Sequence, residues 1–94
     1  MIYEVFPSKQ FKKDLKVAKS RGKKIELLTE AIKILANGDE LPKKYRDHLL
    51  TASRNYNGAM RECHIQPDWL LVYEKQEEKL FLYLARTGSH SDLF

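Results

Sequence analysis

The sequence predicts an α+β domain of the order β-α-α-β-β-β(-β), in which an antiparallel sheet carries two N-terminal helices on one face. Three observations lead to this prediction. Two segments with apolar residues at helical spacing lie within residues 8–37, two β-rich segments flank a proline turn at residues 66–69, and a further apolar segment follows at residues 80–85. A chain of 94 residues suits one domain spanning 1–94, with one modest core.

The first helix is predicted to follow a short β-type segment at residues 2–6 that ends at Pro7. Ser8 is a favoured helix N-cap, and Phe11, Leu15 and Ala18 then recur at helical spacing to about residue 19. The positions between them are basic, so the helix has an apolar stripe and a lysine-dominated back: Lys9, Lys12, Lys13, Lys16 and Lys19.

The second helix is predicted for residues 24–37, after a break at Arg21-Gly22. Asn37-Gly38 supplies the left-handed residue that ends such a helix. Neither helix can bury its apolar face on the other alone, so both are expected to lie on the sheet. The apolar stripe of this helix is continuous and consists of Ile25, Leu28, Ile32 and Leu35.

The strands of the sheet are predicted mainly in the second half of the chain. Residues 38–58 are loop-like, and residues 59–65 and 69–73 then form a hairpin. Gln66-Pro67-Asp68-Trp69 suits its β-turn, because proline fixes φ at the second position and aspartate tolerates the third. Residues 80–85 are apolar on both parities, which indicates a central strand that is buried on both sides.

Composition excludes several classes of protein. With 43% hydrophobic and 32% charged residues, the chain is neither a disordered tail nor a membrane protein, and residues 1–4 lack the basic and apolar pattern of a signal peptide. The single cysteine, Cys63, excludes an internal disulfide and a cysteine-based zinc site. We expect a cytoplasmic protein, with Cys63 as a small core residue.

Positive charge is concentrated in the first half of the chain. Residues 1–46 contain twelve Lys or Arg against six Asp or Glu, whereas residues 47–94 contain five against seven. This asymmetry fits a surface that meets a polyanion, such as nucleic acid or an acidic protein segment. A solvated helix face explains it equally well.

The candidate chemistry lies in the second half. His48, His64 and His90 lie within or beside loops, and with Asp68 they form a candidate general acid and base set, because imidazole titrates near neutral pH. Ordinary surface histidines and a turn-forming aspartate are the alternative. A zinc site of the three histidines and Asp68 is disfavoured, because the spacing matches no compact ligand pair. A Cys-His nucleophile pair is also disfavoured, because Cys63 alternates away from His64 on its strand.

Cationic and aromatic side chains accompany this set. Arg61 and Arg86, with Lys43 and Lys44, could neutralise a phosphate in its transition state, although Arg61 has the strand parity opposite to that of His64. Surface ion pairs and a strand end are the alternatives for the two arginines. Trp69 suits the core as well as it suits a stacking platform for RNA bases, and Phe94 is the last residue of the chain.

Three segments of the sequence together resemble a known family. They are Lys-Tyr-Arg-Asp-His at 44–48, Arg-Glu-Cys-His-Ile-Gln-Pro-Asp-Trp-Leu-Leu-Val-Tyr at 61–73 and Arg-Thr-Gly-Ser-His-Ser-Asp-Leu-Phe at 86–94. In this order they are similar to the YafQ-type branch of the RelE toxin superfamily. The likeness covers essentially the whole chain. Residues 49–58 depart from the family pattern, in which a shorter link carries a Leu-x-Gly-x-Trp-like stretch, so the likeness fixes His48 less closely than the other histidines.

The resemblance implies a ribosome-dependent mRNA interferase, the toxin of a type II toxin–antitoxin system. Such an enzyme cuts mRNA in the ribosomal A site without a metal or cofactor, by attack of a ribose 2′-OH on the adjacent phosphate. Carried over by motif, the acid and base set would be His48, His64, Asp68 and His90, with Arg86 as phosphate clamp and Phe94 as substrate positioner. Trp69 and Arg61 match the pattern, and we expect them to contact RNA.

The resemblance also implies partners. A cognate antitoxin with an acidic segment and a ribbon-helix-helix domain is expected, besides the ribosome and mRNA. The basic first helix, with Lys12, Lys13 and Lys16, could bind ribosomal RNA or the antitoxin. A basic module that binds RNA or protein without cutting is the competing class, and a toxin of the same scaffold aimed at DNA gyrase is disfavoured by the histidine set.

Overall fold

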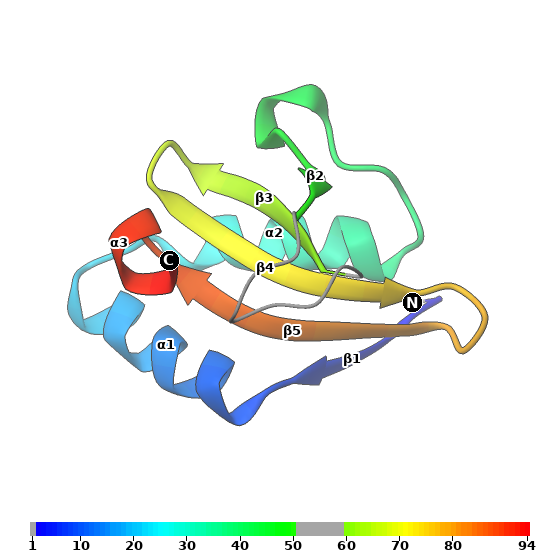
Figure 1. Ribbon diagram of the computed structural model, residues 1–94, viewed down its shortest axis with the longest axis horizontal. Helices are drawn as coiled ribbons and strands as arrows, with labels where there is room; N and C mark the ends of the chain where they lie inside the picture. Colours follow the sequence, from blue (N-terminus) through cyan, green and yellow to red (C-terminus); the bar gives the residue numbers. More distant parts are fainter. Residues whose placement is uncertain (1, 51–59) are drawn as a thin grey trace.

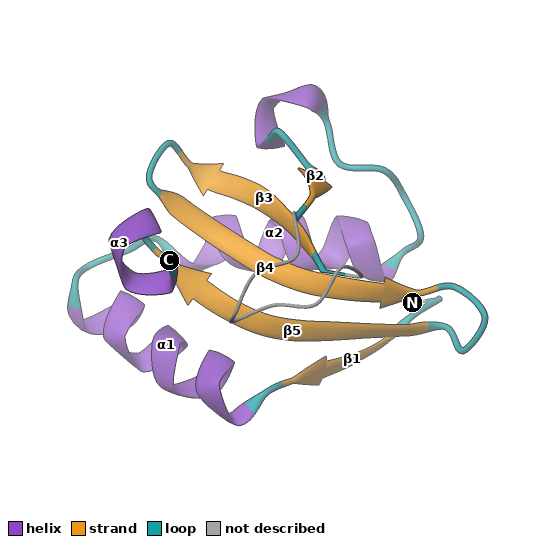
Figure 2. Cartoon of the chain, in the orientation of Figure 1, coloured by secondary structure: helices purple, strands orange, loops and turns teal. Residues whose placement is uncertain are grey.

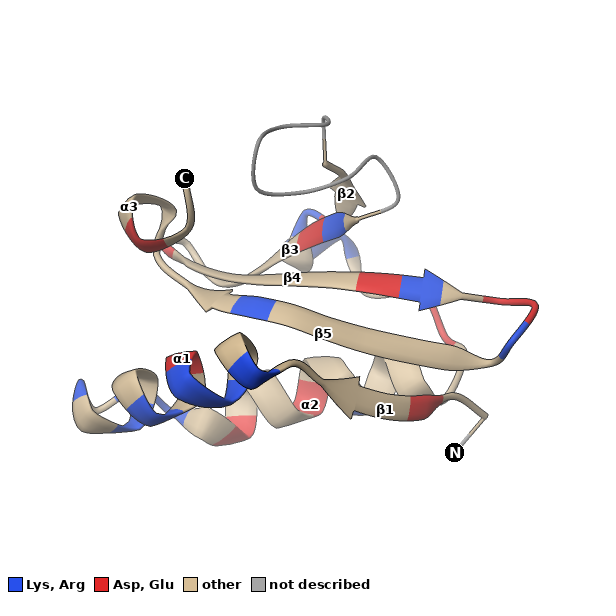
Figure 3. Ribbon diagram, turned by 60° about the horizontal axis from the view of Figure 1, so that its bottom comes forward, with Lys and Arg blue, Asp and Glu red and all other residues tan. Residues whose placement is uncertain are grey.

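One mixed sheet forms the centre of the computed structural model, which describes residues 2–50 and 60–94 (Figure 1). Its strands lie in the order β1-β5-β4-β3-β2. Helices α1 and α2 cover one face, and the short helix α3 lies on the other (Figure 3). The elements are β1 (Glu4–Pro7), α1 (Lys9–Ser20), α2 (Ile25–Ala36), η1 (Lys43–Tyr45), β2 (His48–Leu49), β3 (Arg61–Gln66), β4 (Trp69–Gln76), β5 (Phe81–Gly88) and α3 (His90–Leu93).

The predicted helices are confirmed, and so is the α+β class. Ser8 caps α1, because its Oγ accepts a hydrogen bond from the Phe11 N–H at 2.9 Å while its hydroxyl donates to the carbonyl of Ala85 at 2.8 Å. The helices end where Gly22 and Gly38 adopt φ of 77° and 83°, a region that favours glycine. The cap therefore fixes both the start of α1 and its distance from β5.

The sheet is antiparallel except at one edge, where β1 runs parallel to β5. The connection that this parallel pair requires is the whole segment between β1 and β5, which contains both helices and the other three strands. The helices carry the chain from β1 to the far edge of the sheet, where β2 lies. The predicted hairpin joins β3 and β4 through Pro67 and Asp68, and the central strand β5 lies between β1 and β4 as predicted (Figure 2).

Three short elements were not predicted. The segment predicted as loop contains a 3-10 turn, η1, with Tyr45 buried, and the two-residue strand β2, which pairs with β3. Residues 51–58 of the predicted loop and residue 59 of the predicted hairpin lie outside the described residues. The C-terminal residues form α3, whose capping box joins Ser89 and Asp92. Leu93 is buried against Leu70, so tertiary packing holds this single turn.

Each face of the sheet has its own core. The larger core lies between the helices and the sheet and includes Trp69, Tyr73 and Cys63, which confirms that Cys63 is a core residue. The smaller core, centred on Leu70 and Val72, lies under α3. Within residues 2–50 and 60–94, no helix has the length and apolar character needed to cross a membrane. The face that carries α3 leaves room for polar groups beside the smaller core.

Candidate active site

The three histidines gather along the face of the sheet opposite α1 and α2. His48 lies on β2, His64 on β3 and His90 at the start of α3. The ring centroids of His48 and His64 are 6.4 Å apart, and those of His64 and His90 are 6.2 Å apart. Residues far apart in the sequence thus form one row of imidazoles.

A buried carboxylate lies between two of these rings. Glu62 is 4% exposed, and its Oε1 lies 3.7 Å from His48 Nε2 and 3.6 Å from His64 Nε2. The other ring nitrogens face carbonyl oxygens, those of Arg46 at 2.7 Å and Pro67 at 3.3 Å. A carbonyl only accepts, so each of these two contacts is a hydrogen bond in the tautomer that carries the proton on Nδ1. In that tautomer a second proton at either Nε2 would face the Glu62 carboxylate.

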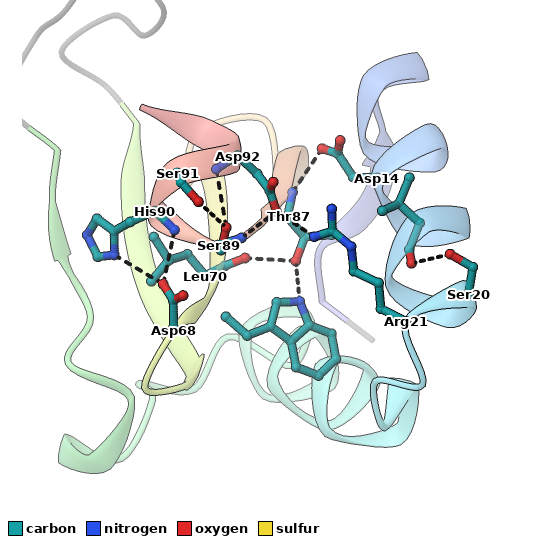
Figure 4. A network of polar contacts seen from close by, with 12 residues as sticks. Asp14, Ser20, Arg21, Asp68, Leu70, Thr87, Ser89, His90, Ser91 and Asp92 are labelled. Carbon is teal, nitrogen blue, oxygen red and sulfur yellow. Dashed lines mark hydrogen bonds and ion pairs between the residues drawn. The ribbon is translucent and has the colours of Figure 1, made fainter.

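A second carboxylate serves the third histidine. The backbone N–H of His90 donates to Asp68 Oδ1 at 3.1 Å, and the His90 Nδ1 lies 3.7 Å from the same oxygen (Figure 4). The ring of Phe94, which is 51% exposed, lies 5.8 Å from the His90 ring. The turn at Asp68 and the capped helix α3 therefore hold His90 and Phe94 beside each other.

Arg86 lies toward α1, where Asp14 binds it. Its Nε and Nη2 donate to the two Asp14 oxygens at 2.8 and 3.1 Å, and the backbone N–H of Thr87 donates to the same carboxylate at 3.1 Å. Both Arg86 and Asp68 line a pocket of about 770 Å³ between α1, the start of β4 and α3. This pocket connects the arginine with the carboxylate of the His90 pair.

Two side chains expected to contact RNA have other roles in the structure. Trp69 is 1% exposed, and its Nε1–H donates to Thr87 Oγ1 at 2.9 Å, so of the two alternatives, core residue and stacking platform, the ring has the core position. Arg61 lies on the helix side, as its parity predicted, and binds Asp47, with its Nε 3.4 Å from Oδ1. Tyr73 donates to the same Oδ1 at 2.6 Å.

The lysines expected to contact RNA lie in two places. Lys43 and Lys44 are exposed on η1, and a hollow of about 370 Å³ is lined by Lys44, Arg46 and His64 among others. The other lysines lie on α1, which covers the opposite face of the sheet from α3 (Figure 3): Lys12, Lys13 and Lys16. Lys44 therefore adjoins His64, whereas the lysines of α1 form a separate basic surface.

Glu62 is the site residue that sequence reasoning missed. Side chains on a strand alternate between the two faces, so Glu62 and His64 share a face. The pairing of β2 with β3 then places His48 opposite Glu62. In the part of the chain that the structure describes, no group of three or more His, Cys, Asp or Glu side chains is arranged to hold a metal ion.

A family model described as "Bacterial toxin of type II toxin-antitoxin system, YafQ" matches residues 3–94. The chain belongs to the YafQ family. A protein named mRNA interferase toxin YafQ, from Escherichia coli strain B / BL21-DE3, is 42% identical over 88 residues, which are 93% of this chain and 90% of the relative.

Solved structures of related toxins have the same fold. A metal-bound toxin from Helicobacter pylori is 40% identical, has a TM-score of 0.87, and the match covers 100% of both chains. In the E. coli DinJ-YafQ complex, the matching chain is 35% identical with a TM-score of 0.86, and the match covers 98% of each chain. The YafQ-family fold therefore extends over essentially the whole of this chain.

Proposed function

We propose that this chain is an mRNA endoribonuclease, the toxin of a toxin–antitoxin system, and that it cuts mRNA in the ribosomal A site. The observation that carries the proposal is the row of three imidazoles with a buried carboxylate at its centre. The relative from E. coli carries the name mRNA interferase, which supports the same activity.

The proposed reaction needs a base, an acid and cationic support. A base takes the proton of the ribose 2′-OH, the oxygen attacks the adjacent phosphorus, and an acid gives a proton to the departing 5′ oxygen. The products carry a 2′,3′-cyclic phosphate and a 5′-OH. Two proton-holding groups on one face, His48-Glu62-His64 and Asp68-His90, can supply the two transfers without a metal ion.

Charge on the phosphate is met by Arg86 in this proposal. Its guanidinium donates from Nε and Nη2 to the two oxygens of Asp14, and two oxygens of a phosphate can take the place of this carboxylate in the same geometry. Lys44 lines a hollow together with His64, and it would bind the RNA backbone with its exposed neighbour Lys43. Phe94, exposed beside His90, would hold the base next to the scissile bond.

A cognate antitoxin is the proposed partner. The related E. coli toxin forms a complex with DinJ, and the basic surface of α1 suits an acidic antitoxin segment, with a ribbon-helix-helix domain in the remainder. Replacing Lys12, Lys13 and Lys16 with Glu should weaken binding of E. coli DinJ, measured by calorimetry. Unchanged affinity would favour ribosomal RNA, in place of the antitoxin, as the ligand of these lysines.

The decisive experiment is cleavage of an mRNA by the purified chain in EDTA, with and without ribosomes, followed by mapping of the new ends. We expect cuts only with ribosomes, with 5′-OH ends despite the chelator. His90→Ala and Asp68→Ala should each abolish cleavage and growth inhibition while the protein stays folded. The matched control is Glu78→Ala, in the turn between β4 and β5 at the other end of the sheet.

Other outcomes would overturn parts of the proposal. Loss of cleavage in EDTA alone would refute the metal-free reaction, and equal cleavage without ribosomes would refute ribosome dependence. A folded protein that binds RNA or DinJ but cuts nothing in either condition would be the non-catalytic binding module. Unfolding of the Asp68 or His90 variant would assign those residues to stability.

A further inference from the structure

The carboxylate of Asp47 joins two side chains from neighbouring strands. The hydroxyl of Tyr73 donates to Oδ1 at 2.6 Å, and the Arg61 guanidinium reaches both oxygens at 3.4 Å. Arg61 on β3 and Tyr73 on β4 are directly paired in the register of the sheet. The three side chains, called here the Asp47 anchor, tie the segment before β2 to the middle of the sheet.

The protonation states of the anchor are fixed by its surroundings. Tyr73 is 1% exposed, and burial, together with its hydrogen bond to Asp47, raises the pKa of its phenol above the ordinary value. Burial lowers the pKa of Arg61, but the hydrogen bond and charge of Asp47 outweigh this effect and raise it. Tyr73 therefore remains a donor and Arg61 a cation at any pH used to assay cleavage.

The next residue in the chain is His48, whose own contacts are the ladder pairing with Glu62 and the contacts of its ring with the Arg46 carbonyl and the Glu62 carboxylate. Strand β2 is two residues long and pairs with β3 alone. Side chains alternate along extended backbone, so the Asp47 side chain points toward the helix side, where Tyr73 lies, while His48 points to the opposite face. The contacts of the Asp47 side chain on the helix side therefore set the position and direction of the His48 imidazole on the opposite face.

The backbone before Asp47 contributes to the same arrangement. Arg46 adopts φ 50° and ψ 40°, a left-handed conformation that is unusual for a residue other than glycine. This turn brings its carbonyl oxygen to 2.7 Å from His48 Nδ1 and leaves Nε2 facing Glu62. The anchor holds the far side of this strained turn, because Asp47 follows it directly.

We propose that the Asp47 anchor positions His48 for RNA cleavage, with Asp47 and Tyr73 as positioning residues that act through the imidazole. The proposal rests on the proposed function, since it assumes that His48 takes part in the reaction. In this proposal Arg61 binds Asp47 and does not contact RNA. A cluster that only stabilises the fold is the alternative, and the two make different predictions.

The test is Tyr73→Phe, which removes the 2.6 Å hydrogen bond and keeps the buried ring. We expect kcat for ribosome-dependent cleavage to fall about tenfold with KM unchanged, because displacing a catalytic group slows the reaction without weakening substrate binding. In a His48→Ala background the same change should have no further effect on residual cleavage measured over long incubation. Tyr3→Phe, another buried tyrosine of the same core, is the matched control and should leave kcat unchanged.

A second measurement does not depend on cleavage. In NMR spectra of the free protein with labelled histidine, Tyr73→Phe should shift the ring signals of His48 and leave those of His90 in place. Unmoved His48 signals, or an equal fall in rate with and without the His48 side chain, would overturn the anchor. If the wild-type protein cuts no RNA, the proposed function fails, while the NMR comparison still decides whether the anchor holds His48.

Discussion

Replacing Glu62 with Gln tests the chemistry of the site most directly. Glu62 is buried, and a single oxygen faces the Nε2 atoms of His48 and His64. Glutamine keeps the shape of the side chain and removes its charge. If the proposed reaction passes through an imidazolium at either ring, the variant loses the anion that stabilises that charge while the backbone stays in place.

The size of the effect follows from the geometry. At the 3.6 Å between Glu62 Oε1 and His64 Nε2, a pair of unit charges is worth about 5 kcal/mol at an effective dielectric of about 20. The side chain of His48 is 51% exposed, so water screens part of this interaction on that side. If about 2–3 kcal/mol survives in the transition state, the cleavage rate falls about 30- to 150-fold.

The assay is ribosome-dependent cleavage of one mRNA under single-turnover conditions, with urea unfolding of the same preparation. We expect Glu62→Gln to fold as stably as the wild type or to gain up to about 1 kcal/mol, because a buried carboxylate opposes folding through its desolvation. Glu74→Gln is the matched control. It removes a carboxylate from β4 that binds Gln76, and it should leave the rate unchanged.

Two results would refute this reasoning. A wild-type rate in the folded Glu62→Gln variant would show that the carboxylate takes no part in the proton transfers. A fall in rate matched by an equal fall in the free energy of unfolding would make Glu62 a structural residue. Loss of rate at unchanged stability is the outcome that the geometry predicts.

Three further predictions concern stability. Thr87→Val leaves the buried Trp69 Nε1–H without its acceptor and should lower the free energy of unfolding by about 1–3 kcal/mol in urea denaturation. Gly22→Ala, where an added Cβ meets nothing within 4 Å but φ is 77°, should cost about 1 kcal/mol through backbone strain alone; an unchanged midpoint would contradict this. Burial raises the pKa of the Cys63 thiol above its ordinary 9.0, so the folded state holds this proton more tightly than the unfolded state. The stability that the Cys63 proton contributes is therefore complete below pH 9.0 and falls as pH rises further, by up to about 1.4 kcal/mol per pH unit. Cys63→Ala should reduce this loss of stability with pH, measured in denaturation series between about pH 8 and about pH 10.5.

The parts of the fold that local signals specify were predictable from the sequence. Ser8 could be identified as a cap because its hydroxyl needs only the N–H three residues on, and the Pro67 turn sets its own geometry. The parallel pairing of β1 was not predictable in this way. Nothing in residues 4–7 tells which strand they meet, since that depends on where two helices return the chain.

The short elements depend on contacts that the sequence does not display. The capping box of Ser89 and Asp92 is a readable signal, but a single turn of helix persists because Leu93 is buried on the sheet. The buried contact supplies what a helix of this length lacks by itself. Likewise β2 is too short for any periodic pattern, and it is defined by its pairing with β3.

The same distinction between local signals and tertiary contacts applies to the site. Alternation along one strand puts Glu62 and His64 on a common face, so that pair was within reach of the sequence. The contacts that decide what the other cations do join residues 72 positions apart for Arg86 and Asp14, and 14 positions apart for Arg61 and Asp47. Only the assembled sheet brings those partners together. An arginine that the sequence offers as a phosphate ligand can therefore be bound by a carboxylate from another element. Its availability to RNA then depends on whether a phosphate can displace that carboxylate.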